Sequence, residues 1–425
     1  MRRLAPFVLL ETSQVLSAVA SGMTYIVLPW LLLQLTGSAL VAGLVTAAKG
    51  LLMFVVFPIS GTFVDRIGRR RVAITADVLS AAAAASFPIV SMIWGPTVGL
   101  AVAVTALGAV FDPPGFTARK ALITNTAQSG NITLERANGI HESIRGLGWI
   151  GGPAFGSLAV ALVGAENAFW VMATFYALSG LAVCFIRITH NVDGETDIEE
   201  SRESFFRDTI DGFRALGRDR PLFILILFWV ILDVVYIPSE EIVLPYYFTQ
   251  QNDPVGLGVV ISAMVLGGTI GALFFEVLLR RLPIPTMVRW CVLICCTVLL
   301  AMAIFPPVWL FALIGFAIGL SWGPLTPLLG YLIQRRFPSN IQGRVFGVQL
   351  ALFSVAPPLM LPVIGALVEQ FGPQPVYLVQ MVVTFVLAIG VVFLPTLKNL
   401  AIDGPEGHHL DDLTRSQKKK RADSA

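Results

Sequence analysis

Carboxylates in the middle of long apolar segments are the residues of this sequence most able to do chemistry. Asp233 and Glu240 lie in one such segment, with no lysine or arginine between them. In a helix of about 3.6 residues per turn they lie on nearly one face, roughly 10 Å apart along the axis. A carboxyl group in apolar surroundings without a counter-charge favours its neutral form, so it can take up and release a proton. The pair therefore predicts a site for proton coupling.

Further ionisable side chains lie in other apolar segments. A charge at the centre of a membrane helix costs roughly 2.5–3.5 kcal/mol, so each one needs a partner or a function. The other candidates for carrying a proton are Asp112, Glu142 and Glu11. Glu142 has the spacing to pair with Arg145 on one helix face. Lys49 stands in mid-segment, and we expect it to meet an acid such as Glu142 or Glu11.

The composition places these groups in lipid. Hydrophobic residues make up 56% of the chain and charged residues 13%, whereas soluble proteins carry roughly 25% charged residues. A water-facing surface needs charge, so lipid is the solvent for most of the chain. The net charge of +2 is too small to indicate a nucleic-acid-binding protein.

The sequence also argues against an enzyme. It has no nucleophile elbow, no metal-ligand cluster and no phosphate-binding loop, so we expect no catalytic residue, no metal and no cofactor. Without a Walker motif, ATP cannot be the direct energy source for transport.

Membrane helices must position the ionisable side chains. A spanning helix needs about 20 mostly apolar residues, and twelve segments meet this requirement. They are residues 7–33, 39–63, 72–94, 97–119, 137–162, 167–187, 221–248, 255–279, 285–305, 307–333, 342–370 and 375–395. The predicted fold class is an all-α membrane protein with twelve transmembrane helices.

A polar stretch divides the chain into two halves. We predict an N-terminal six-helix bundle at 1–189, a cytoplasmic linker at 190–220, a C-terminal six-helix bundle at 221–397 and a basic tail at 398–425. The linker is the only long connection between the predicted helices, so each half is expected to form its own bundle.

Lysine and arginine are distributed unevenly between the two sets of loops. One set contains Arg66, Arg69, Arg70, Arg71, Arg119, Lys120, Arg136, Arg280, Arg281, Arg335, Arg336 and Arg344, and the opposite set contains none. By the positive-inside rule, the basic loops, the linker and both termini are cytoplasmic in a cell (inner) membrane. We expect Asp77, near a cytoplasmic helix end, to pair with one of the arginines at 69–71.

The two halves repeat one another. Ile26–Trp30 in the first predicted helix recurs as Ile242–Tyr246 in the seventh, and Arg136 with Gly139 recurs as Arg344 with Gly347. Parallel repeats of this kind are typical of transporters that bind substrate near the bilayer midplane, between the repeats.

A glycine- and arginine-rich turn follows the second predicted helix. Its key residues are Gly61, Asp65, Arg66, Gly68, Arg69 and Arg70. Gly61 would allow close helix approach, Asp65 would accept backbone N–H bonds from a helix terminus, Gly68 would allow the turn, and the arginines would face cytosol and lipid phosphate. The alternative is merely a basic cytoplasmic loop.

This turn resembles the signature loop of the major facilitator superfamily. The resemblance implies two six-helix bundles around a central cavity, with the loop as a conformational lock of the outward-facing state. The corresponding turn at 271–281 departs from the pattern, which puts a second lock in doubt.

The fifth predicted helix carries a stripe of small residues: Gly139, Gly148, Gly152, Pro153 and Gly156. Small residues on one face let membrane helices approach closely, and a proline invites a bend. The full spacing resembles the antiporter signature of drug–proton antiporters. The alternative is an ordinary packing face.

Longer stretches, including Phe111–Gly115 and Tyr236–Glu240, resemble macrolide-efflux proteins and actinobacterial multidrug (tetracycline and aminoglycoside) efflux proteins. This resemblance implies a wide apolar cavity. The aromatic candidates for contacting substrate are Tyr25, Trp30, Phe111, Tyr236, Tyr246 and Trp322.

The predicted function is secondary active export of small amphipathic compounds or drugs, by proton antiport with alternating access. The expected partners are a small-molecule substrate, protons and the lipid bilayer, with no nucleic acid, and the chain is expected to work as a monomer. The alternative within transport is a lipid or siderophore exporter. The repeated halves and the glycine stripe argue against a receptor or scaffold.

Overall fold

The computed structural model describes residues 4–186 and 212–393. Residues 1–3, 187–211 and 394–425 lie outside this part, and with them most of the predicted linker and the whole basic tail. All regular structure in the described ranges is helical. The all-α prediction is therefore confirmed.

The first half contains five helical elements. They are α1 (Ala5–Thr36), α2 (Ala39–Ile67), α3 (Arg69–Trp94), α4 (Val98–Gly130) and α5 (Leu134–Cys184). α5 covers two of the predicted spans, 137–162 and 167–187. The two are separated by Gly164, whose φ of 82° is not helical. Glycine adopts such a φ without the steric penalty of a side chain, so the chain reverses there with no loop.

The second half is built from shorter pieces. They are α7 (Arg220–Pro238), the π-helix η2 (Ser239–Val243), α8 (Leu244–Gln250), α9 (Pro254–Leu273), α10 (Phe275–Arg281), α11 (Ile284–Met302), α12 (Val308–Trp322), α13 (Leu325–Arg336), α14 (Ser339–Phe371) and α15 (Pro373–Val392). The seventh predicted span is thus α7, η2 and α8 together, and the tenth is α12 with α13.

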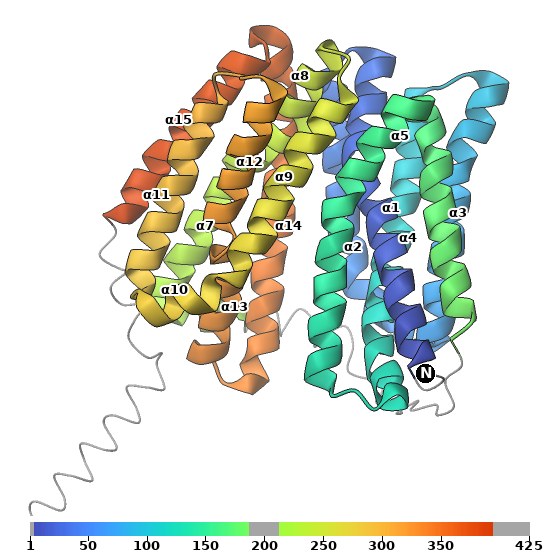
Figure 1. The fold of residues 1–425 in the computed structure, drawn as a ribbon, viewed down its shortest axis with the longest axis horizontal. Coiled ribbons are helices and arrows are strands. Elements are labelled where there is room, and N and C mark those ends of the chain that lie inside the picture. The colour runs from blue at the N-terminus through green and yellow to red at the C-terminus, as the bar shows by residue number, and fades with distance from the viewer. Residues whose placement is uncertain (1–3, 187–211, 394–425) are drawn as a thin grey trace, which may run out of the picture.

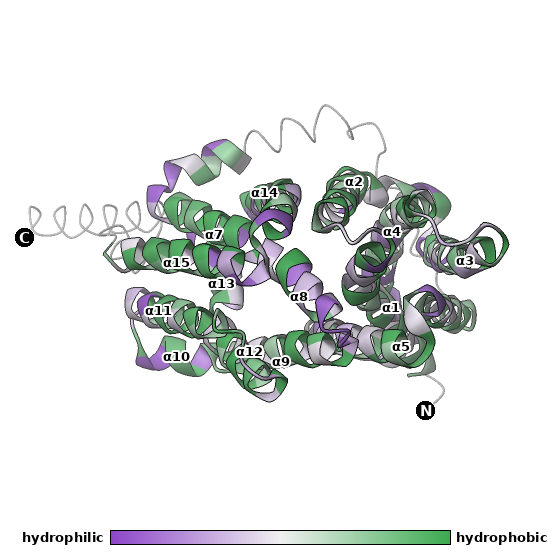
Figure 2. Cartoon of the chain, turned by 90° about the horizontal axis from the view of Figure 1, so that it is seen from above, coloured by the Kyte–Doolittle hydropathy of each residue, from purple (hydrophilic) through white to green (hydrophobic). Residues whose placement is uncertain are grey.

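The number of spans agrees with the twelve predicted. Within the described residues, 11 helices are long and apolar enough to cross a membrane, and one of them contains the break at Gly164. Figure 1 shows α1–α5 grouped on one side of the molecule and α7–α15 on the other. Figure 2, which looks at the molecule from above, shows that most of the ribbon in both groups is formed by hydrophobic residues.

The two halves meet closely at the end opposite the N-terminus of α1. A side-chain carbon added at Gly43 of α2 would come within 2.6 Å of the Leu361 carbonyl oxygen of α14. The backbone N–H of Leu40 donates to Glu369 Oε1 across the same contact, at 2.9 Å. α5 and α9 form a second contact, where Gly258 lies against the Ser157 side chain.

The halves are not packed together in this way at the other end of α2. A side-chain carbon added at Gly61 would meet no atom of the described residues within 4 Å. The predicted close helix approach at Gly61 is therefore wrong for this conformation. The physical reason is that the contacts between the halves gather at the opposite end.

The glycine stripe of α5 packs against α1. A side-chain carbon added at Gly152 would come within 2.5 Å of the Gly22 Cα atom, and one added at Gly156 within 3.0 Å of the Met23 carbonyl oxygen. Gly148 lies equally close to Ala18. Gly139 does not share this contact, because no atom of the described residues lies within 4 Å of a carbon added there.

We predict that Gly152→Val destabilises the protein, whereas Gly139→Val does not. The new side chain at position 152 would overlap the α1 backbone, and overpacking of this kind costs about 1–3 kcal/mol. The measurement is thermal unfolding of the purified variants in detergent. Equal unfolding temperatures for both variants would show that α1 and α5 do not depend on this contact.

Candidate functional site

Two cavities lie beside η2, and both take residues from the two halves of the chain. The larger has a volume of about 630 Å³ and is lined mainly by α7, α9, α11 and α12, with Glu142 and Ser143 added from α5. The smaller has a volume of about 360 Å³ and is lined mainly by α1, α2 and α4, with Glu241, Pro358 and Leu361 added from the second half.

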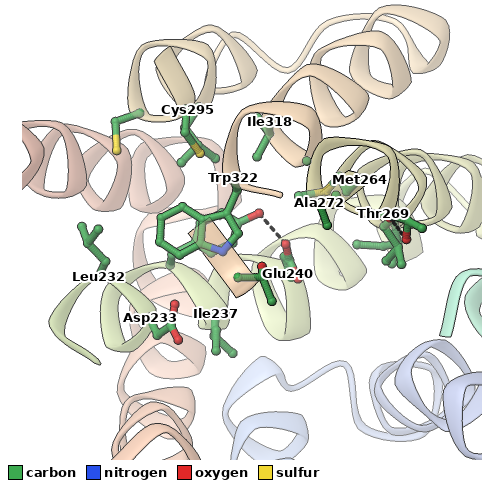
Figure 3. Close-up of a pocket in the computed structure, with 18 of the residues that line it drawn as sticks. Leu232, Asp233, Ile237, Glu240, Met264, Thr269, Ala272, Cys295, Ile318 and Trp322 are labelled. Atoms are coloured by element: carbon green, nitrogen blue, oxygen red, sulfur yellow. Dashed lines mark hydrogen bonds between the residues drawn. The ribbon is translucent and has the colours of Figure 1, made fainter. Parts of the chain in front are cut away.

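The larger cavity is mostly apolar, and its polar lining consists of hydroxyl side chains and three acids. Asp233, Glu240 and Glu142 line it, and no lysine or arginine of the described residues does so. In Figure 3, Asp233, Glu240 and Trp322 lie around one common space, with Met264 and Ile318 contributing to its wall. The helical spacing predicted a shared face for Asp233 and Glu240, and both side chains line this one cavity.

Glu240 is held by hydroxyl groups from both halves. Tyr236, one turn earlier in α7, donates to Glu240 Oε1. Tyr25 of α1 donates to Glu240 Oε2 at 3.3 Å. This second bond joins the first half to the second. Relative movement of the halves would therefore change the distance between Tyr25 and Glu240.

The π-helix η2 directs neighbouring acids into different cavities. Glu240 lines the larger cavity and Glu241 the smaller one. A π turn inserts extra chain into an α-helix and occurs often at functional sites. Sequence periodicity at a constant helical step could not show where this insertion falls.

Asp112 is the fixed acid of the smaller cavity. It accepts hydrogen bonds from the hydroxyl groups of Ser80 at 2.9 Å, Tyr176 at 3.1 Å and Ser21 at 3.5 Å. Lys49 lines the same cavity and interacts electrostatically with Asp112 and Glu241.

We expected Lys49 to meet Glu142 or Glu11. This expectation is wrong, because both acids contact other residues. Glu142 Oε2 accepts a 2.6 Å bond from Arg145, which confirms that predicted pair. Glu11 lies outside both cavities, buried against His141 with 3.1 Å between Oε1 and Nδ1.

Three of the six aromatic candidates line the cavities: Tyr25 the smaller, Tyr236 and Trp322 the larger. Trp30, Phe111 and Tyr246 line neither. Trp30 is 1% exposed within the hydrophobic core, and Tyr246 packs against that core. Phe111 precedes Asp112, and one residue turns a helix by about 100°, so the two side chains cannot share a direction.

The predicted lock lies at the turn from α2 to α3. Gly68 has a φ of 97°, which confirms the need for glycine there. Arg66 is exposed, and the side chain of Asp65 lies outside the described part.

Arg69 and Arg70 were predicted to face cytosol and lipid phosphate, but both form hydrogen bonds within the protein. Arg69 donates to Asn125 Oδ1 at 2.9 Å and Arg70 to the Cys184 carbonyl oxygen at 2.6 Å. Carbonyl groups at helix C-termini lack partners in the helix and attract cations, which explains the contact of Arg70 with the end of α5.

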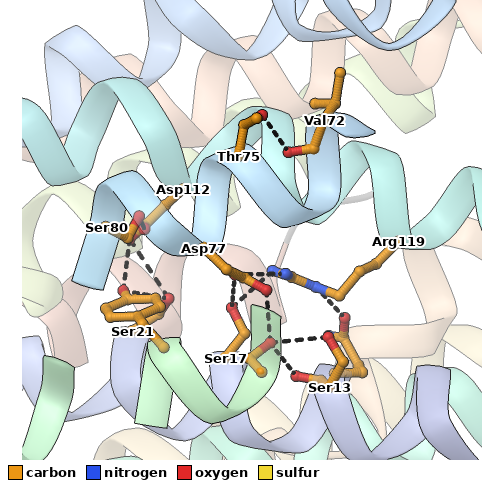
Figure 4. Close-up of polar contacts among 12 residues, drawn as sticks. Ser13, Ser17, Ser21, Val72, Thr75, Asp77, Ser80, Asp112 and Arg119 are labelled. Carbon is orange, nitrogen blue, oxygen red and sulfur yellow. Dashed lines mark hydrogen bonds and ion pairs between the residues drawn. The ribbon is translucent and has the colours of Figure 1, made fainter. Parts of the chain in front are cut away.

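A buried ion pair that the sequence did not reveal holds the first half together (Figure 4). Arg119 of α4 contacts Asp77 of α3 at 2.8 Å, with side chains 5% and 3% exposed. Arg119 also donates to Ser17 Oγ at 2.7 Å, and Asp77 accepts from Ser179 at 2.7 Å. The expected pairing of Asp77 with residues 69–71 is therefore wrong.

The cause is the length of α4. It continues to Gly130, so Arg119 lies within a helix and not in the predicted loop. Apolarity marks where a helix leaves the membrane, not where it ends. The second half has a comparable pair at 2.5 Å between Arg336 and Asp219, with side chains 7% and 0% exposed.

The structure offers no metal site among its described residues, where no group of three or more metal-ligating side chains occurs.

Comparison with known proteins relates nearly the whole chain to membrane transporters. The model of the Major Facilitator Superfamily matches residues 11–349 and 241–409. Multidrug efflux pump Tap of Mycolicibacterium fortuitum is 32% identical, over 93% of this chain and 97% of its own length. Macrolide efflux protein A of Streptococcus pyogenes is 23% identical, over 86% of this chain and 90% of its own length.

Solved structures share the fold. The nucleoside transporter NupG superposes with a TM-score of 0.70 at 14% identity, over 91% of this chain and 98% of that chain. A bacterial homologue of the iron transporter ferroportin, in an inward-facing state, gives a TM-score of 0.68 at 16% identity, over 93% and 100%.

We predict that Arg119→Met lowers the free energy of unfolding by about 3–5 kcal/mol, because it leaves the Asp77 carboxylate buried without its partner. Arg119→Met combined with Asp77→Asn should recover part of the loss. Arg280→Met is the matched control, since its pair with Glu276 is 77% and 72% exposed and contributes little. Denaturant titration of the purified proteins measures the effect; equal losses for Arg119→Met and Arg280→Met would contradict it.

Proposed function

The chain belongs to the major facilitator superfamily and is a multi-pass membrane transporter, and on that premise we propose that it exports small amphipathic compounds, drugs among them, in exchange for protons. The observation that carries the proposal is the larger cavity, in which Asp233 and Glu240 lie in a mostly apolar wall without a lysine or arginine of the described residues.

Such a cavity suits an organic cation. The apolar wall favours the body of an amphipathic compound, and the aromatic face of Trp322 attracts a positive charge. A carboxyl group there binds either a proton or the cation, but not both at once. Exchange of the two ligands then follows from competition for Asp233 and Glu240.

The relatives support the export of drugs. A multidrug efflux pump is 32% identical over nearly the full length of both chains, and macrolide efflux proteins match at lower identity. The proton as the coupling ion is an inference from the acids of the cavity.

Alternating access requires the halves to separate at one end and close at the other. The closed end lies at the contacts of α2 with α14 and of α5 with α9. We propose that this end faces the outside of the cell and that both termini lie in the cytoplasm of an inner-membrane protein; the concentration of lysine and arginine in the opposite loops supports this orientation. We propose that the bundles at 1–189 and 221–397 are the moving units, joined by the linker at 190–220.

The other sequence motifs have roles in the same proposal. The turn of Gly61, Asp65, Arg66, Gly68, Arg69 and Arg70 acts as the conformational lock. Of the predicted antiporter residues Gly139, Gly148, Gly152, Pro153 and Gly156, we propose that Gly148, Gly152 and Gly156 form the functional face of α5, since these three pack against α1. We propose that the protein works as a monomer in lipid.

Accumulation of dyes and antibiotics by cells with and without the protein tests export directly. Lower accumulation that a protonophore abolishes is the expected result. Unchanged accumulation of every drug, together with export of a labelled lysophospholipid or siderophore, would replace drugs by those compounds as the substrate class.

We predict that Asp233→Asn and Glu240→Gln each uncouple export from the proton gradient. Each variant removes a carboxyl group that exchanges proton for substrate, so substrate-induced proton release from purified, reconstituted protein should fall toward background. Glu276→Gln, at a side chain 72% exposed, is the control and should release protons like the wild type. If both cavity variants also do so, the coupling acid lies elsewhere, with Asp112, Glu142 and Glu11 next in order.

A further inference from the structure

Lys49 occupies an unusual position for a charged residue. It lies in the middle of α2, and its side chain lines the smaller cavity. Its electrostatic partners are Asp112 from the first half and Glu241 from the second. Within the described part of the chain, no carboxylate forms a direct ion pair with Lys49. Its ammonium group therefore shares the cavity with the two acids and is not in direct contact with either.

Other bases of the smaller cavity are already paired. Arg119 lies 2.8 Å from Asp77, and Arg145 lies 2.6 Å from Glu142. Lys49 is therefore the base that remains to neutralise Asp112 and Glu241.

Asp112 is built to stay in place as an acceptor. Three hydroxyl groups donate to it, from Ser80, Tyr176 and Ser21. Together with Glu241, it gives the smaller cavity two carboxyl groups, as Asp233 and Glu240 do in the larger one. The smaller cavity differs in its bases: Lys49, Arg119 and Arg145 line it, and of these three only Lys49 forms no ion pair within the described residues.

The cavities adjoin each other at η2. Glu240 lines the larger cavity, and Tyr25, which donates to Glu240, lines the smaller one. A molecule bound at Asp233 and Glu240 therefore lies next to the subsite of Asp112 and Glu241.

We propose that Lys49 is a tethered cation that fills this second cation subsite, so that the transporter selects compounds with one positive charge over compounds with two. The proposal rests on the proposed binding of organic cations in the larger cavity. A second positive charge on the same molecule would point toward the Lys49 ammonium group, and like charges repel strongly where little water screens them. Lys49 is thus a specificity-determining residue.

The test compares ethidium with propidium, because the two dyes share one ring system but carry one and two positive charges. The quantity measured is the ratio of the propidium Kd to the ethidium Kd, from fluorescence of the purified protein. In the wild type, propidium should bind more weakly by about tenfold or more, the scale of a close charge–charge interaction. Lys49→Met should lower the ratio toward one.

Three further variants distinguish charge from structure. Lys49→Arg keeps the positive charge and should keep the wild-type ratio. Arg280→Met removes an exposed cation that, like its partner Glu276, lines neither cavity, and should also leave the ratio unchanged. Lys49→Met combined with Asp112→Asn should lose part of the gain in propidium binding, since one acid of the freed subsite is then neutral.

An unchanged ratio in Lys49→Met, in protein that still binds ethidium, overturns the role of Lys49 but leaves the proposed function standing. Equal binding of both dyes by the wild type does the same. A wild type that binds neither dye overturns the cation site itself, and with it both proposals. A fall in the ratio with Lys49→Arg as well would show that shape, not charge, excludes propidium, which also overturns the inference.

Discussion

Backbone contact between helices of opposite halves is the constraint on which the rest of the structure depends. At Gly43 and Gly258 there is no room for a side-chain carbon between the two halves. Lipid gives membrane helices no hydrophobic reason to associate, so close packing and polar contacts must hold them together. The acids beside η2 line cavities that take residues from both halves, so they do not face hydrocarbon.

Buried charges within each half form ion pairs, whereas the acids of the larger cavity do not form ion pairs with each other or across the halves in the described residues. Arg119 with Asp77 and Arg336 with Asp219 are almost fully buried pairs, each within one half. Such pairs fix the helices of a bundle relative to one another, because separating the partners would leave a buried charge. Between the halves, Asp233 and Glu240 have hydroxyl or apolar neighbours and no ion pair in the described residues, so they remain available to a ligand.

The sequence alone predicted the features that are set within a single segment. Apolarity gave the spans, and the helical step placed Asp233 and Glu240 on one face. It failed where the answer depends on which helices meet. Asp77 pairs with an arginine from a neighbouring helix, and Lys49 faces acids of two other helices. Hydropathy also cannot separate a side chain that faces a cavity, such as Trp322, from one in the core, such as Trp30.

The span from Arg220 to Gln250 belongs to two hydrophobic cores, with η2 at their boundary. Before the π turn, Trp229 and Leu232 pack in a core made only of second-half residues. After it, Leu244 and Phe248 pack in a core that includes Val27 and other residues of the first half. The outer part of this span is thus anchored to the opposite bundle. Any motion that separates the bundles at their closed end must either pull the outer part of this span out of the opposite bundle or bend the span. The regular main-chain hydrogen-bond register is already interrupted at η2. η2 is therefore where the span would bend most easily.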